Sequence, residues 1–318
     1  MKGLTDIPGL LVGHATDRQA VTGCTAILCP DGATAGVDIR GSATGSLQTD
    51  VLTPLHLNEK IHGLCLAGGS AFGLEAASGV VRFLESKGHG FPTGAGVVPL
   101  VPAAILYDLG VARKGVRPGR EMGFAAAEAA TSDAVAEGCV GAGTGATVGK
   151  LYGMAQAMKS GIGSATVWLD GPYAGIRVAA LAAVNAFGDV RDPESGHILA
   201  GARVSPQSGQ FADMAFQLKR GARGGFRNEN TTLVAVATNA RLSKIEANKL
   251  AQFASIGVAR TISPVWTTSD GDITFALSLG AERADLTAIG IAASEAVSAA
   301  ILRSVRLAES LPGIPGLR

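Results

Sequence analysis

The sequence is poor in charge, and the charge it has is balanced. Its 318 residues include 27 Lys and Arg against 26 Asp and Glu, so only 17% of residues are charged and the formal net charge is +1. Aromatic residues make up 5%, and no basic run is interleaved with them. Proteins that bind nucleic acids carry a basic patch that neutralises phosphates. The composition therefore predicts no nucleic-acid partner.

Cysteine and histidine are also scarce, and neither is spaced for a metal. Cys24, Cys29, Cys65 and Cys139 form no Cys-x-x-Cys pair, and the five histidines form no His-Glu-x-x-His motif. Common zinc sites show such spacings. We expect reduced, structural thiols of the kind found in cytoplasmic proteins, and neither a metal nor a cofactor.

Long apolar runs are missing as well. Residues 1–9 contain an early acid and a proline, and so lack the apolar core of a signal peptide. Gly, Pro or a charge interrupts the other apolar runs before about 18 residues, the length of a membrane span. We expect no membrane partner. Glycine is abundant, with 44 residues, and 47% of the chain is hydrophobic. This composition indicates close packing and favours an oligomer.

Periodicity in the hydrophobic pattern predicts a mixture of strands and helices. Strands are expected at 10–14, 23–29, 33–40, 61–67, 164–170, 178–184 and 231–238, and helices at 71–87, 119–130, 243–255 and 285–307. Strands 10–14 and 23–29 read as a hairpin or meander with antiparallel pairs. The pattern therefore predicts an α/β or α+β fold with helices packed outside sheets.

Several connections carry their own predictions. Pro30-Asp31-Gly32 is expected to be a turn between two strands, and Ser70 to cap the helix that follows it. The Gly/Ser/Thr-rich segment 41–53 is long enough for a functional loop. Segment 189–225 has few apolar residues and reads as a mobile linker. In helix 243–255, Ser243 and Glu246 form a capping box, and the expected buried face includes Ile245, Leu250 and Phe253.

A polar turn that runs into a strand places Thr231 at the first strand position, after Asn230. By itself this pattern is typical of a turn followed by β-branched residues. If the bond before Thr231 were cut, however, the new terminus would carry a hydroxyl nucleophile and an α-amine. Such an amine has an unperturbed pKa of roughly 7.7–8.0, so it can act as a general base near neutral pH.

A second polar cluster, Asp270-Gly271-Asp272, also precedes a predicted strand. Two close carboxylates can orient a hydroxyl and an ammonium group. The alternatives are a solvated turn and a calcium loop. A calcium loop that begins at Asp270 requires ligands at positions that hold Thr274 and Ala281, and glycine where Phe275 stands. The calcium reading therefore fails.

Two glycine-rich segments resemble motifs that they do not complete. Residues 141–150 look like a phosphate loop, but the Walker pattern requires glycine at Thr144 and Ser or Thr at Leu151. Residues 68–71 suggest a hydrolase elbow, but its second glycine is replaced by Phe72. Neither nucleotide binding nor a Ser70 nucleophile is expected.

Asn230-Thr231-Thr232 followed by residues 270–276 resembles the DmpA-like (P1) peptidase family, which includes L-aminopeptidase/D-esterases, β-aminopeptidases and nylon-oligomer hydrolases. Residues 64–76 and 104–109 are similar to further family segments. The Thr nucleophile with two Asp partners looks most like the nylon-oligomer (6-aminohexanoate-oligomer) hydrolase branch. The β-aminopeptidases have a Ser nucleophile and a Ser/Glu pair instead.

The resemblance implies a fold and a way of activation. The fold would be one αββα domain over residues 1–318, of the kind found in N-terminal-nucleophile hydrolases and ornithine acetyltransferases. Autocleavage between Asn230 and Thr231 would give a 1–230 chain and a 231–318 chain that stay together. Four copies of this processed heterodimer would form a homotetramer.

The resemblance also implies a catalytic set and a class of substrate. Thr231 would be the nucleophile, oriented by Asp270 and Asp272. Lys150 and Asn185 would stabilise the oxyanion, with Tyr107 nearby; in isolation these three read as a surface lysine, a turn residue and a core tyrosine. The substrate would be a small peptide or amide oligomer with a free amine. The rival readings are an acyltransferase of the ornithine-acetyltransferase type and an unprocessed, non-enzymatic binding protein.

Overall fold

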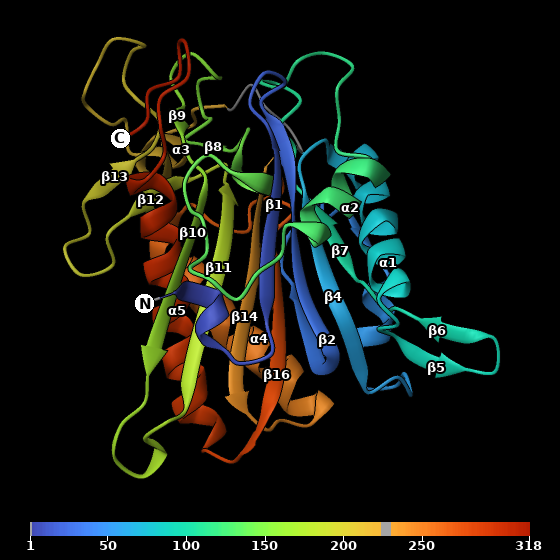
Figure 1. The fold of residues 1–318 in the computed structure, drawn as a ribbon. Helices are drawn as coiled ribbons and strands as arrows, with labels where there is room; N and C mark the ends of the chain where they lie inside the picture. The colour runs from blue at the N-terminus through green and yellow to red at the C-terminus, as the bar shows by residue number, and fades with distance from the viewer. Residues whose placement is uncertain (1, 224–229) are drawn as a thin grey trace.

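The computed structural model describes residues 2–223 and 230–318, which form four layers (Figure 1). One mixed sheet supplies both central layers. Its strands run in the order β10 (Ile162–Trp168), β11 (Arg177–Asn185), β14 (Thr231–Ala240), β16 (Ile273–Glu282), β2 (Thr22–Ile39), β4 (Lys60–Ala67), β7 (Ala103–Ile105) and β3 (Ser46–Leu47), and β1 (Leu11–Asp17) pairs with β2 outside this path.

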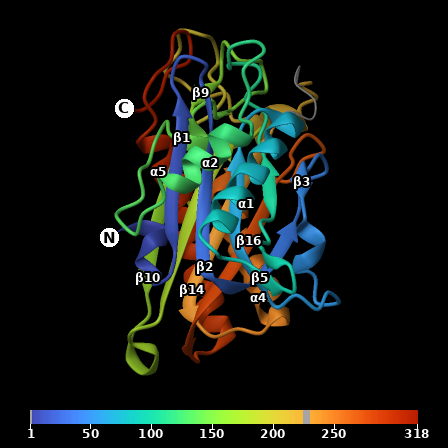
Figure 2. The same ribbon diagram turned by 45° about the vertical axis from the view of Figure 1, so that its right-hand side comes forward.

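The helices cover the two outer faces of this sheet. Helices α1 (Ala76–Ser86) and α2 (Arg120–Glu128) lie on one side, and α4 (Lys244–Thr261) and α5 (Leu286–Arg306) on the other (Figures 1 and 2). Smaller elements complete the described chain: α3 (Met214–Lys219), the hairpins β5 (Phe91–Thr93) with β6 (Gly96–Val98) and β8 (Thr147–Val148) with β9 (Met158–Lys159), and a small sheet of β12 (Asp189–Arg191), β13 (Ile198–Ala200) and β15 (Ile262–Ser263).

Side-chain alternation explains the layers, because successive residues of a strand point to opposite faces. In β14, Val234 and Val236 pack with α4 and α5, whereas Leu233, Ala235 and Ala237 pack against the other central layer. Strand β2 alternates in the same way between α1 and α2 on one face and the inner core on the other. The expected αββα architecture is confirmed.

Strand β2 belongs to both central layers. Its first half pairs with β1, through partners such as Leu28 and Leu11, and its second half pairs with β16, through partners such as Ile39 and Ile273. The predicted turn at Pro30-Asp31-Gly32 is wrong, because β2 continues through it. The register against β4 shifts between Leu28 and Ala33, and Gly32 has φ 82°. Turn residues therefore form a bulge here.

The helix predicted from residue 71 begins differently. Residues Ser70–Glu75 form a 3-10 helix, and α1 starts only at Ala76. Ser70 lies at φ 54° and its side chain makes no capping bond, so the predicted cap is wrong. An N-cap residue needs extended backbone, which this left-handed position does not provide. The predicted end of this helix at residue 87 is confirmed within one residue, since α1 ends at Ser86, and Gly88 just beyond it has φ 77°.

The predicted linker 189–225 is also wrong for its described part, residues 189–223. It holds β12, β13 and α3, and the buried Asp189 carboxylate joins them by accepting the backbone N–H of Ala202 and of Met214, both at 2.8 Å. Hydrogen bonds to this one carboxylate therefore hold together a segment that has few apolar residues to pack. Its last two residues and the rest of 224–229 lie outside the described residues.

Helix α4 differs from its prediction in length and in part of its buried face, and helix α5 is unusually apolar. The capping box of Ser243 and Glu246 is confirmed, but α4 extends to Thr261 and Ile245 is 70% exposed. Leu250 is buried as predicted, Phe253 is half-buried, and small residues such as Ala247 and Ala254 complete the buried face. Helix α5 has the length and mean hydropathy, 1.4, of a membrane span, and 67% of that window is buried within the fold. Burial against the sheet accounts for its apolar composition.

Candidate active site

The candidate residues meet where the ends of three strands, β11, β14 and β16, lie side by side. Strand β14 begins at Thr231 and pairs antiparallel with β11, so that Thr231 faces Asn185, the last residue of β11. Strand β16 runs parallel to β14, and a bridge joins Asn230 to Asp270 just before it. Because β14 and β16 start at the same edge, the Asp-Gly-Asp turn lies beside the Asn230–Thr231 bond.

Two donors converge on the carbonyl of that bond. The Thr231 hydroxyl donates to the Asn230 carbonyl oxygen at 2.6 Å, and the backbone N–H of Gly271 donates to the same oxygen at 2.7 Å. Both residues of the bond are buried, Asn230 at 1% and Thr231 at 3% exposure. A Cβ on Gly271 would lie 2.7 Å from the Thr231 hydroxyl oxygen, so only glycine admits this approach.

The two aspartates occupy different environments. Asp270 accepts the backbone N–H of Thr267 at 2.9 Å, its hydroxyl at 2.6 Å and the N–H of Phe187 at 3.2 Å. Asp272 accepts the N–H of Thr232 at 2.6 Å. Burial, and then the neighbouring charge of Asp270, raises the pKa of Asp272 well above its usual range. Burial and the neighbouring carboxylate therefore favour the protonated form of Asp272, because two buried carboxylates cannot readily both ionise.

Lys150 is bonded to Asn185, the residue that pairs with Thr231 between β11 and β14. The buried Lys150 ammonium donates to the Asn185 backbone oxygen at 2.9 Å and to its Oδ1 at 2.7 Å. The N–H of Thr147 also donates to this Oδ1, at 3.1 Å, and Asn185 Nδ2 donates to the backbone oxygen of Tyr107 at 2.9 Å. The structure thus brings Lys150, Asn185 and Tyr107 together.

The glycine-rich loop before Lys150 holds a buried lysine. Lys159 is fully buried and donates to the backbone oxygens of Gly143, Ala146 and Ser160. Gly143 and Ala146 of the loop therefore direct their carbonyl oxygens at Lys159, and the N–H of Thr147 donates to Asn185. A phosphate cradle requires such N–H groups to point at the ligand. The loop positions Lys150 instead.

Sequence reasoning missed three contributors to this site. Gly271 acts through its backbone N–H, which leaves no side-chain signature, and Thr267 is three residues before the aspartate it binds. The third is segment 41–53, which the sequence predicts to be a functional loop but for which it predicts no contact. The N–H of Gly41 donates to the Asp272 backbone oxygen at 3.0 Å, and that of Ala43 to the Asp270 oxygen at 3.0 Å. This segment holds the backbone of the aspartate turn.

The chain is similar to known proteins over most of its length. The sequence model of "Peptidase family S58" matches residues 2–318. An uncharacterized aminopeptidase of Mycobacterium tuberculosis is 38% identical, with 100% of this chain and 97% of the relative covered. A 6-aminohexanoate-oligomer endohydrolase of Kocuria sp. is 32% identical, with 95% and 85% covered.

Solved structures show the same fold. The L-aminopeptidase D-Ala-esterase/amidase of Ochrobactrum anthropi, described as a variant of the Ntn hydrolase fold, superposes with a TM-score of 0.76 at 20% identity, covering 98% of this chain and 89% of the other. A Burkholderia β-aminopeptidase gives 0.71 at 22% identity, covering 100% and 91%.

Proposed function

The chain belongs to peptidase family S58 and is an enzyme of the peptide and amide hydrolase class, and from this premise we propose that it cuts its own Asn230–Thr231 bond and then uses Thr231 as an N-terminal nucleophile. The observation that carries the proposal is the carbonyl oxygen of Asn230, which accepts both the Thr231 hydroxyl and the Gly271 N–H. The nucleophile and an oxyanion donor thus already adjoin the bond to be cut.

Self-cleavage begins with attack of the Thr231 hydroxyl oxygen on the Asn230 carbonyl carbon. The Gly271 N–H stabilises the oxyanion that forms, as a preorganised donor does. The aspartate pair, which carries one proton, takes the hydroxyl proton and returns one to the departing Thr231 nitrogen. The resulting ester is hydrolysed by water, which leaves a carboxylate on Asn230 and a free amine on Thr231.

The mature enzyme then works through an acyl-enzyme. The Thr231 α-amine accepts the hydroxyl proton as the oxygen attacks a substrate amide, and later protonates the leaving amine. Asp270 and Asp272 orient the hydroxyl and balance the ammonium charge. Lys150 and Asn185 stabilise the substrate oxyanion, and Tyr107 lines the site. Water finally releases the acid and restores Thr231.

The substrate class follows from the relatives. Relatives more than 30% identical include an uncharacterized aminopeptidase and a 6-aminohexanoate-oligomer endohydrolase. We assign this chain a small peptide or amide oligomer with a free amine. Residues 1–230 and 231–318 act as two chains of one αββα domain, and the homotetramer stays a prediction that native mass spectrometry would check.

Assays of matched threonine variants test the proposal. Thr231→Ala should remain one chain and lose hydrolysis of short peptides and of 6-aminohexanoate oligomers, because it lacks the hydroxyl. Thr268→Ala is the control, since Thr268 is exposed in the same turn region and should keep both cleavage and turnover. Wild-type turnover by Thr231→Ala would place the nucleophile elsewhere.

A further inference from the structure

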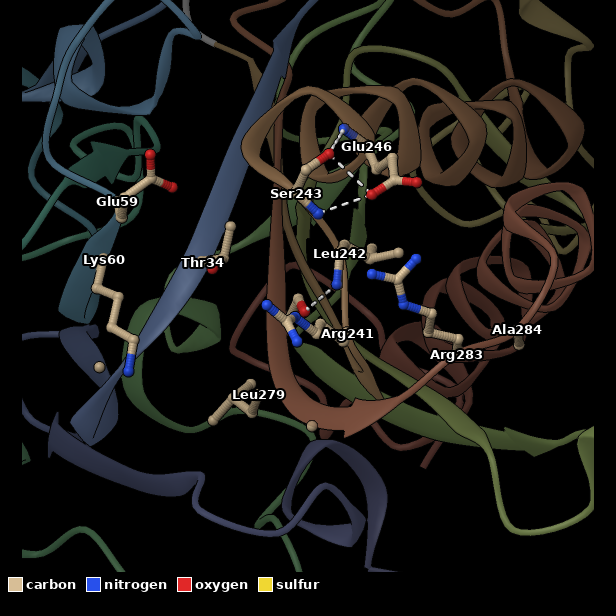
Figure 3. A pocket seen from close by; sticks show the side chains of 13 residues that line it. Thr34, Glu59, Lys60, Arg241, Leu242, Ser243, Glu246, Leu279, Arg283 and Ala284 are labelled. Atoms are coloured by element: carbon tan, nitrogen blue, oxygen red, sulfur yellow. Dashed lines mark hydrogen bonds between the residues drawn. The ribbon is translucent and has the colours of Figure 1, made fainter.

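A cavity of about 550 Å³ lies at the far end of β14 from Thr231 (Figure 3). Thr231 is the first residue of this strand, and Arg241, which lines the cavity, follows its last residue, Ala240. The two residues are ten positions apart along the chain, or about 30 Å at the usual rise. The volume falls in the range of small-molecule sites, on the order of 300–1,000 Å³. The cavity is therefore separate from the catalytic site.

One wall of the cavity carries two guanidinium groups. Arg241 comes from the turn between β14 and α4, and Arg283 follows the end of β16; Figure 3 shows both side chains at the same side of the hollow, beside Leu242. Within residues 2–223 and 230–318, neither arginine forms an ion pair. Two guanidinium groups on one wall are suited to a carboxylate, which they can bind through charge-assisted hydrogen bonds.

The neighbouring carboxylate on this wall already has partners. Glu246 accepts the backbone N–H of Ser243 at 2.7 Å and its hydroxyl at 2.8 Å. These bonds, reinforced by the charge of Arg283, keep the pKa of Glu246 below its usual range. Glu246 is thus committed to capping α4, and the wall keeps an excess of positive charge.

The opposite wall carries one carboxylate, Glu59, beside one ammonium group, Lys60. Glu59 and Lys60 lie across the β2 ribbon from the arginines (Figure 3). The Lys60 ammonium is directed to the Asp31 backbone oxygen, at 3.3 Å, and no ion pair of Glu59 occurs among the described residues. A ligand that spans the cavity would therefore meet cations at one end and the Glu59 carboxylate at the other.

We propose that this cavity binds a small zwitterion, either an ω-amino acid or a short peptide. Its carboxylate lies between Arg241 and Arg283, and its ammonium faces Glu59. The site is formed by β2, β4, the β14–α4 turn and the end of β16, and it makes no use of the chemistry at Thr231.

Calorimetric titration with three matched probes tests the site. The probes are 6-aminohexanoate, which has both charges, hexanoate, which has only the carboxylate, and hexylamine, which has only the ammonium. The zwitterion should bind most tightly. Arg241→Gln and Arg283→Gln should each weaken it about tenfold or more, the usual effect of losing a charge-assisted bond. Glu59→Gln should weaken 6-aminohexanoate but not hexanoate.

Two controls separate this site from the catalytic one. Arg260→Gln changes an exposed arginine on α4 that does not line the cavity, and it should leave the affinity unchanged. Thr231→Ala should also keep the binding, so the test stands even if the proposed self-cleavage fails. Binding that survives the Arg241→Gln/Arg283→Gln double variant, hexanoate as tight as the zwitterion, or no saturable binding at millimolar concentration would each overturn the assignment.

Discussion

At the carbonyl of Asn230, a side-chain hydroxyl and a backbone N–H meet on one oxygen. The hydroxyl of Thr231 could be anticipated from sequence, because a threonine at a strand start after a polar turn has a recognisable pattern. The N–H of Gly271 could not be anticipated, because a backbone donor is specified only by the fold. The glycine between two aspartates was visible, but its purpose depends on the distance to Thr231.

Gly271→Ala tests this approach directly. The added Cβ would lie 2.7 Å from the Thr231 hydroxyl oxygen and 2.6 Å from the Ala43 backbone oxygen, so the hydroxyl has to move from the carbonyl. We expect chain cleavage to slow by about tenfold or more, since displacement of about 1 Å from a reactive geometry costs up to about 10²-fold. A denaturing gel time course measures the rate.

The control for this variant is Gly94→Ala, where an added Cβ meets no atom within 4 Å. It should mature at the wild-type rate. If Gly271→Ala also matures at that rate, the Gly271 position does not shape the cleavage site.

Asp272→Asn tests the aspartate pair. Asparagine keeps the size of the side chain and can still accept the Thr232 N–H, so folding should stay near normal. The pair can no longer exchange a proton through this position during self-cleavage, where proton transfer contributes roughly 10²–10⁴-fold in enzymes, and in the mature enzyme it loses a charge that balances the Thr231 ammonium. Turnover of a short peptide should fall by about 10²-fold or more, as steady-state kinetics would show. Unchanged kinetics would remove Asp272 from the mechanism.

At the scale of elements, the long periodic segments were predictable and the short polar ones were not. Strand β11 and helix α5 follow their hydrophobic patterns closely. The bulge at Pro30-Asp31-Gly32 was mistaken for a turn because bulges and turns use the same residues. Segment 189–223 was mistaken for a linker because its structure depends on the buried Asp189, whose partners Ala202 and Met214 are distant in sequence.

Asp189 makes the stability of this segment depend on pH. Burial raises its pKa from 3.8 to about 6, so the folded protein retains a proton that the unfolded chain loses. The contribution of this proton to the free energy of unfolding is therefore fully present below pH 4 and is lost as the pH rises through 6. The shift corresponds to about 3 kcal/mol at most.

Asp189→Asn removes this titration. The unfolding free energy of the wild type, measured by urea denaturation at several pH values, should fall relative to the variant by up to about 3 kcal/mol between pH 4 and pH 7. A constant difference across this range would show that Asp189 does not titrate there.

At the scale of the whole molecule, the proposed cleavage point lies at the start of a central strand of the sheet. Strand β14 pairs with β11 on one side and β16 on the other, and its side chains enter both the helix-covered core and the core between the central layers. Sequence indicated the αββα fold through family resemblance, whereas the pattern alone reached only α/β or α+β. The sharing of β2 between layers required the structure.

Because of this position, cutting the chain before Thr231 should not separate its parts. Residues 1–230 and 231–318 should elute together in native size-exclusion chromatography and separate only in denaturant. Dissociation of the two parts under native conditions would contradict the shared core.

The central claim is that the protein cuts itself between Asn230 and Thr231. The most direct measurement is the intact mass of the purified protein under denaturing conditions. The account predicts two species, residues 1–230 and 231–318, whose masses sum to the 32.0 kDa chain plus one water. A single full-length species that persists on prolonged incubation, yet hydrolyses peptides, would contradict it, because Thr231 would then have no free amine.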